Sequence, residues 1–419
     1  MPDRPKVVIL GGGFGGVGAV KKLKHADADV VLYDKHDYHT FQPLLYQVAT
    51  DLIETTTVGH QLRDLFRDHE NLTVHEATVS GIDLENRTVS FDKMEPQPYD
   101  QLVLGLGATV NFFGVPGAEE HAYPLYTLPD AVRLRRHILE RWEAADRDPS
   151  LVDDGALNVV VVGAGPTGVE SAGAIAELYR SNFAKDFPNL PQDKARVVMV
   201  EAGDAVLSMF KKGLQTYAKK ALEKRTVEIR LGEVVEKIEP TRVHLKSGET
   251  IDAHTLVWGA GMQANPLVST LSLELQHGGR IPTEPDLSIA GRPEVFVAGD
   301  IGWITDTKTN KVLPQLGSVA LQAGEHAGEN ISRRLEGKDT EPFKYLDKGT
   351  MATIGPRAAV VQMPHGRSLT GRTAWLSWGA VHLALLSTDE ARARALLDWV
   401  WGIFTHERAG RILVDDDDQ

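Results

Sequence analysis

The residues with the clearest chemical meaning are two glycine-rich stretches, Gly11-Gly12-Gly13-Phe14-Gly15-Gly16 and Gly163-Ala164-Gly165-Pro166-Thr167-Gly168. Both follow the pattern G-x-G-x-x-G. In this pattern one glycine allows a tight turn, the next lets backbone N–H groups approach a pyrophosphate, and the last permits a helix to pack closely on a strand. The N-terminus of the helix then faces the anion. Each stretch therefore predicts a dinucleotide-binding site.

The first stretch lies between two predicted strands. Residues 6–10 are a short apolar run, which is typical of a buried parallel strand, and residues 29–33 are predicted to be a second strand. Asp34 follows the second run, where a carboxylate can accept hydrogen bonds from the ribose of the bound nucleotide. Taken alone, Asp34 could also be a solvated acid at a strand end. The order of strand, glycines, helix, strand and acid favours the binding site.

The second stretch has the same surroundings. Residues 157–162 are predicted to be an apolar strand and residues 196–200 its partner strand, and Glu201 follows the latter. The longer interval between glycines and acid comes from residues 181–195, which contain two prolines and are expected to be a helix extension and a loop. An acid at Glu201 suits the free 2′-hydroxyl of NADH and repels the 2′-phosphate of NADPH. A nucleotide fold with a non-nicotinamide ligand is the alternative.

Composition excludes several classes of protein. A chain of 419 residues exceeds one hydrophobic core, so two or three packed units are expected. The net charge of −13 argues against nucleic-acid binding. The absence of cysteine excludes disulfides, thiol mechanisms and cysteine-ligated metal, and no metal site is expected. The N-terminus leads directly into a strand, which predicts a cytoplasmic protein without a secretory signal, and no apolar run reaches membrane-spanning length.

With these motifs, the chain resembles the type II NADH dehydrogenases, single-subunit flavoproteins that oxidise NADH and reduce quinone at the membrane without pumping protons. The resemblance extends to six further blocks, at residues 38–50, 102–117, 257–265, 295–302, 348–355 and 399–413. It implies an α/β fold with two Rossmann-like dinucleotide-binding domains on the glutathione-reductase-like plan, followed by a C-terminal helical segment. The implied domains are an FAD-binding domain in two parts (1–120 and 263–365), a connecting helix and linker (121–155), an NADH-binding domain (156–262) and an amphipathic C-terminal segment for membrane association or dimerisation (366–419).

The resemblance also implies which residues form the sites. Tightly but non-covalently bound FAD is expected at Gly11, Gly13, Phe14, Gly15, Gly16, Asp34, Ala108, Thr109 and Asp300. The NADH substrate is expected at Gly163, Gly165, Gly168, Glu201, Ala260 and Gly261. Asp300 follows the strand 295–298, where an acid is also often only a cap. Glu170, in the first turn of its helix, is expected beside the nicotinamide and flavin, although such an acid can also be only a partner of the helix dipole.

The acceptor motif departs from the family pattern. The family has A-Q-x-A-x-Q where this chain has residues 317–322, GSVALQ. Gln322 is kept, Ser318 is shorter than glutamine, and Gly317 removes a methyl group and should widen the slot. The expected catalytic residues are thus Glu170, Ser318 and Gln322. The quinone is expected to sit differently, to bind weakly, or to be replaced by another acceptor.

The C-terminal segment combines aromatic and basic residues. Residues 372–404 contain four of the seven tryptophans, Trp375, Trp378, Trp399 and Trp401. Such a segment can lie in the membrane interface. The arginines that anionic lipid would attract are Arg367, Arg372, Arg392, Arg394, Arg408 and Arg411. A buried pair of dimer helices is the alternative, and a homodimer is expected. The tail 415–418 is expected to be an acidic end.

These observations favour a peripheral enzyme of the respiratory chain, on the cytoplasmic face of the membrane. It would transfer hydride from NADH to FAD and pass electrons to a membrane quinone, with menaquinone preferred. A disulfide reductase and a sulfide:quinone reductase are excluded because both need redox cysteines. The altered acceptor motif leaves open an NADH-dependent reductase of a soluble acceptor. A redox-sensing flavoprotein with little quinone turnover is the other alternative.

Overall fold

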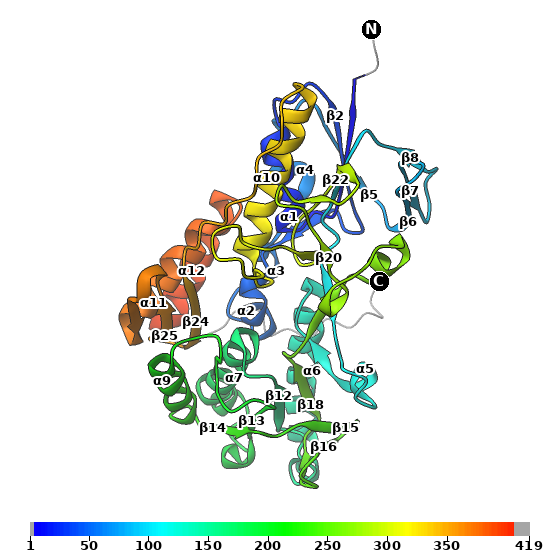
Figure 1. Cartoon of the computed structure of the whole chain (residues 1–419). Coiled ribbons are helices and arrows are strands. Elements are labelled where there is room, and N and C mark those ends of the chain that lie inside the picture. The colour runs from blue at the N-terminus through cyan, green and yellow to red at the C-terminus, as the bar shows by residue number, and fades with distance from the viewer. Residues whose placement is uncertain (1–3, 406–419) are drawn as a thin grey trace. The chain divides into compact units, whose positions relative to one another are not determined.

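The computed structural model describes residues 4–405, which form two compact units (Figure 1). Unit 1 comprises Met1–Thr40, Gly59–Thr109 and Met262–Leu346, and unit 2 comprises Phe41–Val58, Val110–Gly261 and Asp347–Gln419. The expected acidic tail, Arg408, Arg411 and the end of the block 399–413 lie outside the described residues. No helix in the described part of the chain is long and apolar enough to cross a bilayer.

Unit 1 is built on a six-stranded sheet in the order β21-β22-β9-β1-β2-β5. All neighbouring pairs are parallel except β21 and β22. From β1 the chain passes through the first glycine-rich loop into a helix, so the loop lies at the carboxyl end of a central strand. The strands are β1 (Lys6–Leu10), β2 (Asp29–Asp34), β5 (Leu72–Glu76), β9 (Gln101–Leu104), β21 (Ser288–Ile289) and β22 (Arg292–Val297).

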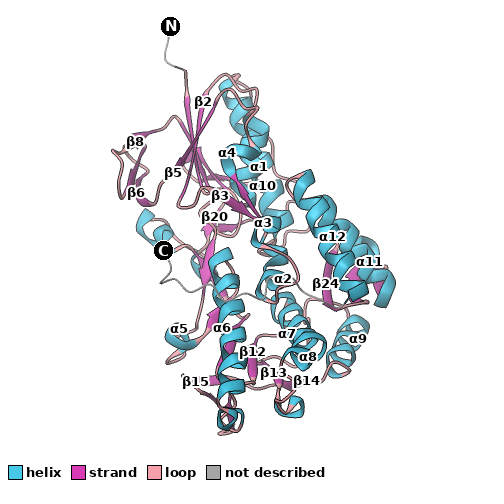
Figure 2. Ribbon diagram, turned by 180° about the vertical axis from the view of Figure 1, so that it is seen from behind, coloured by secondary structure: helices cyan, strands magenta, loops and turns pink. Residues whose placement is uncertain are grey.

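Two helices cover one face of this sheet, α1 (Phe14–Leu23) and α10 (Gly317–Leu335). They run side by side in both views (Figures 1 and 2). A Cβ atom at Gly324 would lie 1.8 Å from the carbonyl oxygen of Gly15, so only glycine permits this close approach. The opposite face of the sheet packs on a three-stranded sheet of β6 (Val79–Asp83), β7 (Thr88–Phe91) and β8 (Gln97–Pro98).

Unit 2 contains a five-stranded parallel sheet in the order β11-β18-β12-β13-β14. The second glycine-rich loop joins β12 to α7, which repeats the arrangement of unit 1. The strands are β11 (Tyr123–Pro124), β12 (Val159–Val162), β13 (Val197–Glu201), β14 (Val227–Leu231) and β18 (Thr255–Trp258). The helices used below are α2 (Leu45–Ala49), α3 (Thr55–Val58), α6 (Leu128–Arg147), α7 (Pro166–Leu178) and α9 (Lys212–Glu223).

The C-terminal part of unit 2 combines a small sheet with two helices. The sheet consists of β24 (Thr350–Gly355), β25 (Ala358–Gln362) and β26 (Ser368–Thr370), and α11 (Gly371–Leu385) and α12 (Asp389–Thr405) follow it. β24 packs against α7, and α12 packs against α3. Residues 41–58, 110–120 and 347–365 are predicted from the sequence to belong to the FAD-binding parts, but they lie in unit 2 because most of their contacts are made there.

The four strands predicted around the two glycine loops are all present. β1 has the predicted bounds, and the other three begin or end within two residues of them. The segment predicted as a helix extension and loop contains the end of a π-helical turn (Tyr179–Phe183), a short helix (Ala184–Asp186) and a 3-10 turn (Gln192–Lys194).

Candidate functional site

In the first glycine loop, the fold requires glycine at two positions and leaves room for a side chain at a third. Gly11 has a φ of +104°, which disfavours any other residue. A Cβ at Gly16 would lie 1.8 Å from the Gly11 carbonyl oxygen. Gly13 is different, because a Cβ there would meet nothing within 4 Å, and it precedes α1 without a side-chain cap. The helix N-terminus therefore faces open space, as an approaching pyrophosphate requires.

The second loop repeats this geometry in unit 2. Gly163 has a φ of +95°, and a Cβ at Gly168 would lie 1.9 Å from the Gly163 carbonyl oxygen. Gly165 again has nothing within 4 Å and precedes α7 without a side-chain cap. Ala260, at the end of the neighbouring strand, lies against the loop, since a Cβ at Gly163 would be 3.1 Å from the Ala260 Cβ. The carbonyl oxygen of Gly261 accepts from a backbone N–H of the adjoining 111–113 segment.

The two predicted acids hold the loops in the same way. Asp34 accepts a hydrogen bond through Oδ2 from the N–H of Gly12 at 2.6 Å, and Glu201 accepts through Oε2 from the N–H of Ala164 at 2.7 Å. The other oxygen of each carboxylate accepts from the backbone N–H two residues further on. A carboxylate can accept about four hydrogen bonds. Each acid can therefore clamp its loop and still accept from a ribose hydroxyl.

The residues expected around FAD fit such a ligand. The Thr109 hydroxyl is buried and has no hydrogen-bond partner among residues 4–405, so it is available to a bound molecule. Ala108 beside it is buried. Asp300 lies just after β22, where its backbone carbonyl accepts from the side chain of Gln315. The open position at Gly13 supplies the room for the phosphates.

A buried histidine outside the set of predicted site residues supports the first loop. His39 donates from Nδ1 to the carbonyl oxygen of Gly12 at 2.8 Å and is 2% exposed. Burial lowers its pKa to about 4, so the ring is neutral at physiological pH. The Phe14 ring meets the His39 ring edge to face at 5.1 Å. The block 38–50 could have drawn attention to this residue, but nothing in the sequence shows its partner.

Glu170, in α7, is half-buried and lies against β24. Its Oε1 accepts from the backbone N–H of Thr353 at 3.2 Å. Burial raises the pKa of Glu170 to about 8, and the hydrogen bond from Thr353 opposes that rise. Desolvation disfavours the charged carboxylate, so the side chain is mostly protonated near neutral pH. Such a carboxyl can donate a proton, which an ordinary surface glutamate cannot do at this pH.

The acceptor motif occupies the start of α10, and its side chains have partners in unit 1. The hydroxyls of Ser318 and Tyr345 share a hydrogen bond at 3.0 Å. The Gln322 amide exchanges two bonds with the backbone of Leu346, at 3.2 and 3.0 Å. The expectation that Gly317 widens a slot is corrected, because a Cβ there would lie 3.1 Å from the ring of Phe14, which fills that space.

The C-terminal helices present apolar side chains to solvent. The exposed ones are Leu376 (63%), Val381 (39%), Leu385 (48%), Leu396 (49%), Leu397 (68%), Val400 (42%), Trp401 (57%) and Phe404 (80%), which we call the C-terminal apolar surface. Trp401 is the only exposed one of the four tryptophans, since Trp378 is buried and the others are half-buried. The predicted basic flank is partly neutralised, because Arg392 and Arg394 pair with acids of the same helix.

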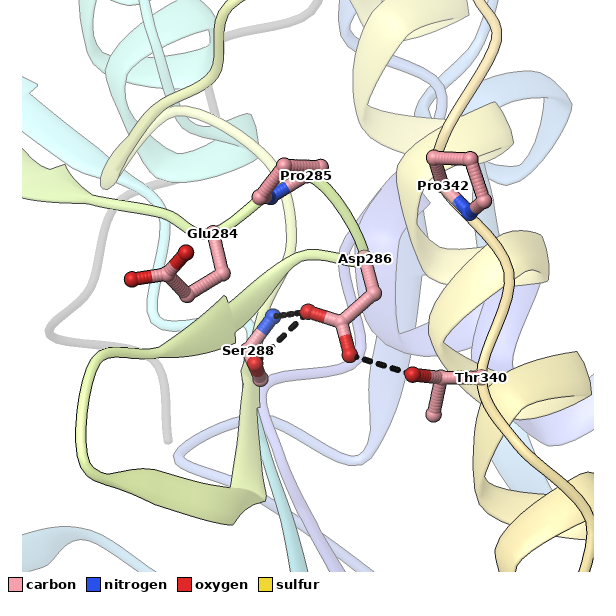
Figure 3. Close-up of a pocket in the computed structure, with 6 residues that line it drawn as sticks. All are labelled: Glu284, Pro285, Asp286, Ser288, Thr340 and Pro342. Carbon is pink, nitrogen blue, oxygen red and sulfur yellow. Dashed lines mark hydrogen bonds between the residues drawn. The ribbon is translucent and has the colours of Figure 1, made fainter.

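Unit 1 also contains a surface hollow of about 340 Å³, shown in Figure 3. The Asp286 carboxylate beside it accepts from Ser288 and Thr340, so it fastens two chain segments together. The lining residues are Glu284, Pro285, Asp286, Ser288, Thr340 and Pro342, none of which belongs to the expected sites. Within residues 4–405, no group of three potential metal ligands is present.

Comparison with known proteins gives consistent matches. The family model of the pyridine nucleotide-disulphide oxidoreductases matches residues 5–324. A type II NADH:quinone oxidoreductase of Mycobacterium tuberculosis, Ndh, is 36% identical over 99% of this chain and 91% of its own length. The type II NADH:quinone oxidoreductase of Staphylococcus epidermidis is 32% identical over 89% of this chain and 92% of its own length.

Solved structures share the fold. NDH2 from Plasmodium falciparum, in complex with NADH, superposes with a TM-score of 0.90 at 18% identity, over 98% of this chain and all of that one. A sulfide:quinone oxidoreductase from Aquifex aeolicus gives a TM-score of 0.72 at 18% identity, over 96% of each chain. From the family model and the relatives above 30% identity, the chain belongs to the pyridine nucleotide-disulphide oxidoreductase family and, within it, to the type II NADH:quinone oxidoreductases.

Proposed function

We propose that the protein oxidises NADH with the help of tightly bound FAD and reduces a membrane quinone, preferably menaquinone, without pumping protons. The observation that carries this proposal is the pair of identically built loops, each with one open glycine and one clamping acid, in a chain of this family. When bound, FAD accepts a hydride and releases electrons singly or in pairs. The protein's own task is to bind, to orient and to supply protons.

The loop of each unit would hold one dinucleotide. In unit 1 the residues proposed to hold FAD are Gly11, Gly13, Phe14, Gly15, Gly16, Asp34, Ala108, Thr109 and Asp300. In unit 2 the residues proposed to hold NADH are Gly163, Gly165, Gly168, Glu201, Ala260 and Gly261. Glu170 would act as a proton donor during acceptor reduction, because its carboxyl keeps its proton near neutral pH.

The acceptor assignment rests on Ser318 and Gln322. The Ser318 hydroxyl and its partner Tyr345 offer two groups that can donate to a quinone carbonyl in place of the missing glutamine. Gln322 would have to leave the Leu346 backbone to do the same. Because Gln322 is already bonded to the Leu346 backbone, a second candidate function is favoured, which is NADH-dependent reduction of a soluble acceptor.

One titration tests the function and separates the two candidates. The purified protein should show a flavin absorption band that NADH bleaches faster than NADPH, and a menaquinone analogue should restore it. If ferricyanide or oxygen restores the band and no quinone does, the soluble-acceptor or redox-sensing function replaces quinone reduction.

The clamping acid of unit 2 should determine the choice of nicotinamide. Glu201→Ala removes a charged acceptor for the ribose hydroxyls and the repulsion of a 2′-phosphate, so the preference for NADH over NADPH in kcat/KM should fall by about tenfold or more. Glu236→Ala, at an exposed acid of the same unit, is the matched control. An unchanged preference in Glu201→Ala would show that this carboxylate does not contact the ribose.

The C-terminal apolar surface is proposed to attach the protein peripherally to the cytoplasmic face of the membrane, in a chain that forms homodimers. Leu397→Glu should weaken binding to anionic vesicles by about tenfold, because one large apolar side chain contributes about 1.5–3 kcal/mol when buried. Val234→Glu places the same charge at an exposed apolar residue elsewhere in unit 2 and should leave vesicle binding unchanged. Cosedimentation measures both. Equal binding of the two variants would exclude this surface as the attachment site.

A further inference from the structure

A buried amide connects the C-terminal helix α12 with the surroundings of Glu170. Trp399, in α12, donates its indole N–H to Oε1 of Gln47 at 2.8 Å. Gln47, in α2, is 2% exposed and donates from Nε2 to the hydroxyl oxygen of Tyr46, also at 2.8 Å. These side chains form one chain of hydrogen bonds between segments 352 residues apart. A second bond, from Arg394 to Thr56 at 2.7 Å, fixes α12 to α3.

The hydrogen bonds that link Trp399, Gln47 and Tyr46 can run in only one direction. An indole N–H donates and cannot accept, so the group of Gln47 that faces Trp399 must be the amide oxygen. The amide NH₂ must then face Tyr46, and the phenol oxygen accepts from it. The hydroxyl proton of Tyr46 must therefore point away from Gln47. Trp399 thus determines, through Gln47, where the phenol can donate.

Glu170 is the acid that acts on Tyr46 once its carboxyl is ionised. Tyr46 is 5% exposed, and its pKa is raised well above the ordinary value by burial first and by the charge of Glu170 second. Helix α2 packs against α7, which carries Glu170, and Figure 2 shows the two helices beside each other. One oxygen of the Glu170 carboxyl accepts from Thr353, and a carboxylate has further lone pairs for another donor.

We propose that Trp399 and Gln47 are positioning residues that hold the Tyr46 hydroxyl as a hydrogen-bond donor toward Glu170. The inference rests on the proposed function, because Glu170 needs this donor when it has given its proton to the reduced acceptor. In that state Tyr46 keeps its proton and stabilises the new carboxylate with a charge-assisted hydrogen bond. Without the indole N–H, the Gln47 amide can turn over, and the phenol can donate to Gln47 instead.

The test is a double-mutant cycle with a water-soluble quinone analogue, which removes the membrane from the measurement. Trp399→Phe keeps an aromatic ring and removes the N–H, and should lower kcat about fivefold, the effect of one hydrogen bond, with KM for NADH and FAD content unchanged. Tyr46→Phe should lower kcat by at least as much. In the Tyr46→Phe background, Trp399→Phe should change kcat less than about twofold, because it acts only through that hydroxyl.

Trp375→Phe is the matched control, since Trp375 is half-buried in the neighbouring helix α11 and lies outside the C-terminal apolar surface, and it should leave kcat unchanged. Multiplicative effects of the two substitutions, or an unchanged kcat in Trp399→Phe, would overturn the proposal. Failure of the proposed function would appear separately, as a wild-type protein that reduces no quinone. In that case, the Tm values of wild type, the two single variants and the double variant test the chain of hydrogen bonds. Additive changes in Tm would overturn the chain, and non-additive changes would support it.

Discussion

Gly13→Val should give a folded protein without FAD, and Gly165→Val should give a yellow protein that NADH cannot reduce. Both glycines have extended backbones, with φ near −73° and −71°, that valine adopts without strain. Both also face open space, so the new side chain meets only the ligand. If the valine side chain displaces two backbone N–H bonds to a pyrophosphate, at about 1.5 kcal/mol or more each, the affinity for the nucleotide of that loop falls at least about 100-fold.

Absorption spectra of the purified variants, followed by anaerobic addition of NADH, measure both losses. Gly213→Val is the control, because Gly213 is an exposed glycine of α9 with nothing within 4 Å and lies outside both loops. Gly165→Val and Gly213→Val should keep a Tm within a few degrees of wild type. Gly13→Val should still unfold cooperatively but at a lower Tm, because it lacks the stabilisation that tightly bound FAD gives to the folded protein. A yellow Gly13→Val protein, or a colourless Gly165→Val protein, would show that the two loops are assigned to the wrong nucleotides.

The loops could be predicted from sequence because their requirements are local. Gly11 and Gly16 are needed by a turn of six residues, and Asp34 follows its strand directly, so each requirement is visible in a short segment. The expected FAD and NADH contacts themselves stay predictions, but the loop geometry that they require is present in both units.

The remaining parts of the site depend on partners that sequence spacing cannot reveal. Trp399 resembles any tryptophan of an amphipathic helix until its contact with Gln47 is known. Tyr345 has no motif of its own, and only the structure shows its hydroxyl beside Ser318. The prediction at Gly317 is wrong because it also depends on a neighbour that sequence spacing does not show. Removing a methyl group predicts a wider slot only if no neighbour fills the space, and the Phe14 ring does so.

Glu170→Gln should slow quinone reduction about 100-fold or more, because a positioned general acid typically contributes that much to a rate. Glutamine keeps the size and the acceptor for the Thr353 N–H but has no proton to give. Reduction of the flavin by NADH should change less than about threefold, since hydride transfer needs no acid. Stopped-flow absorption separates the two half-reactions. Equal losses in both would assign Glu170 to nicotinamide binding instead.

The pH dependence gives a second measurement with a defined sign. The folded pKa of about 8 lies above the ordinary 4.5, so between these values the folded protein holds a proton that the unfolded chain has released. Wild-type stability should therefore fall as pH rises from about 4.5 to about 8, and Glu170→Gln should lack this loss. Wild-type quinone reduction should likewise fall as pH passes about 8, because the donor loses its proton. The variant's slow rate should show no such step, and a step that persists in it would assign the titration to another group.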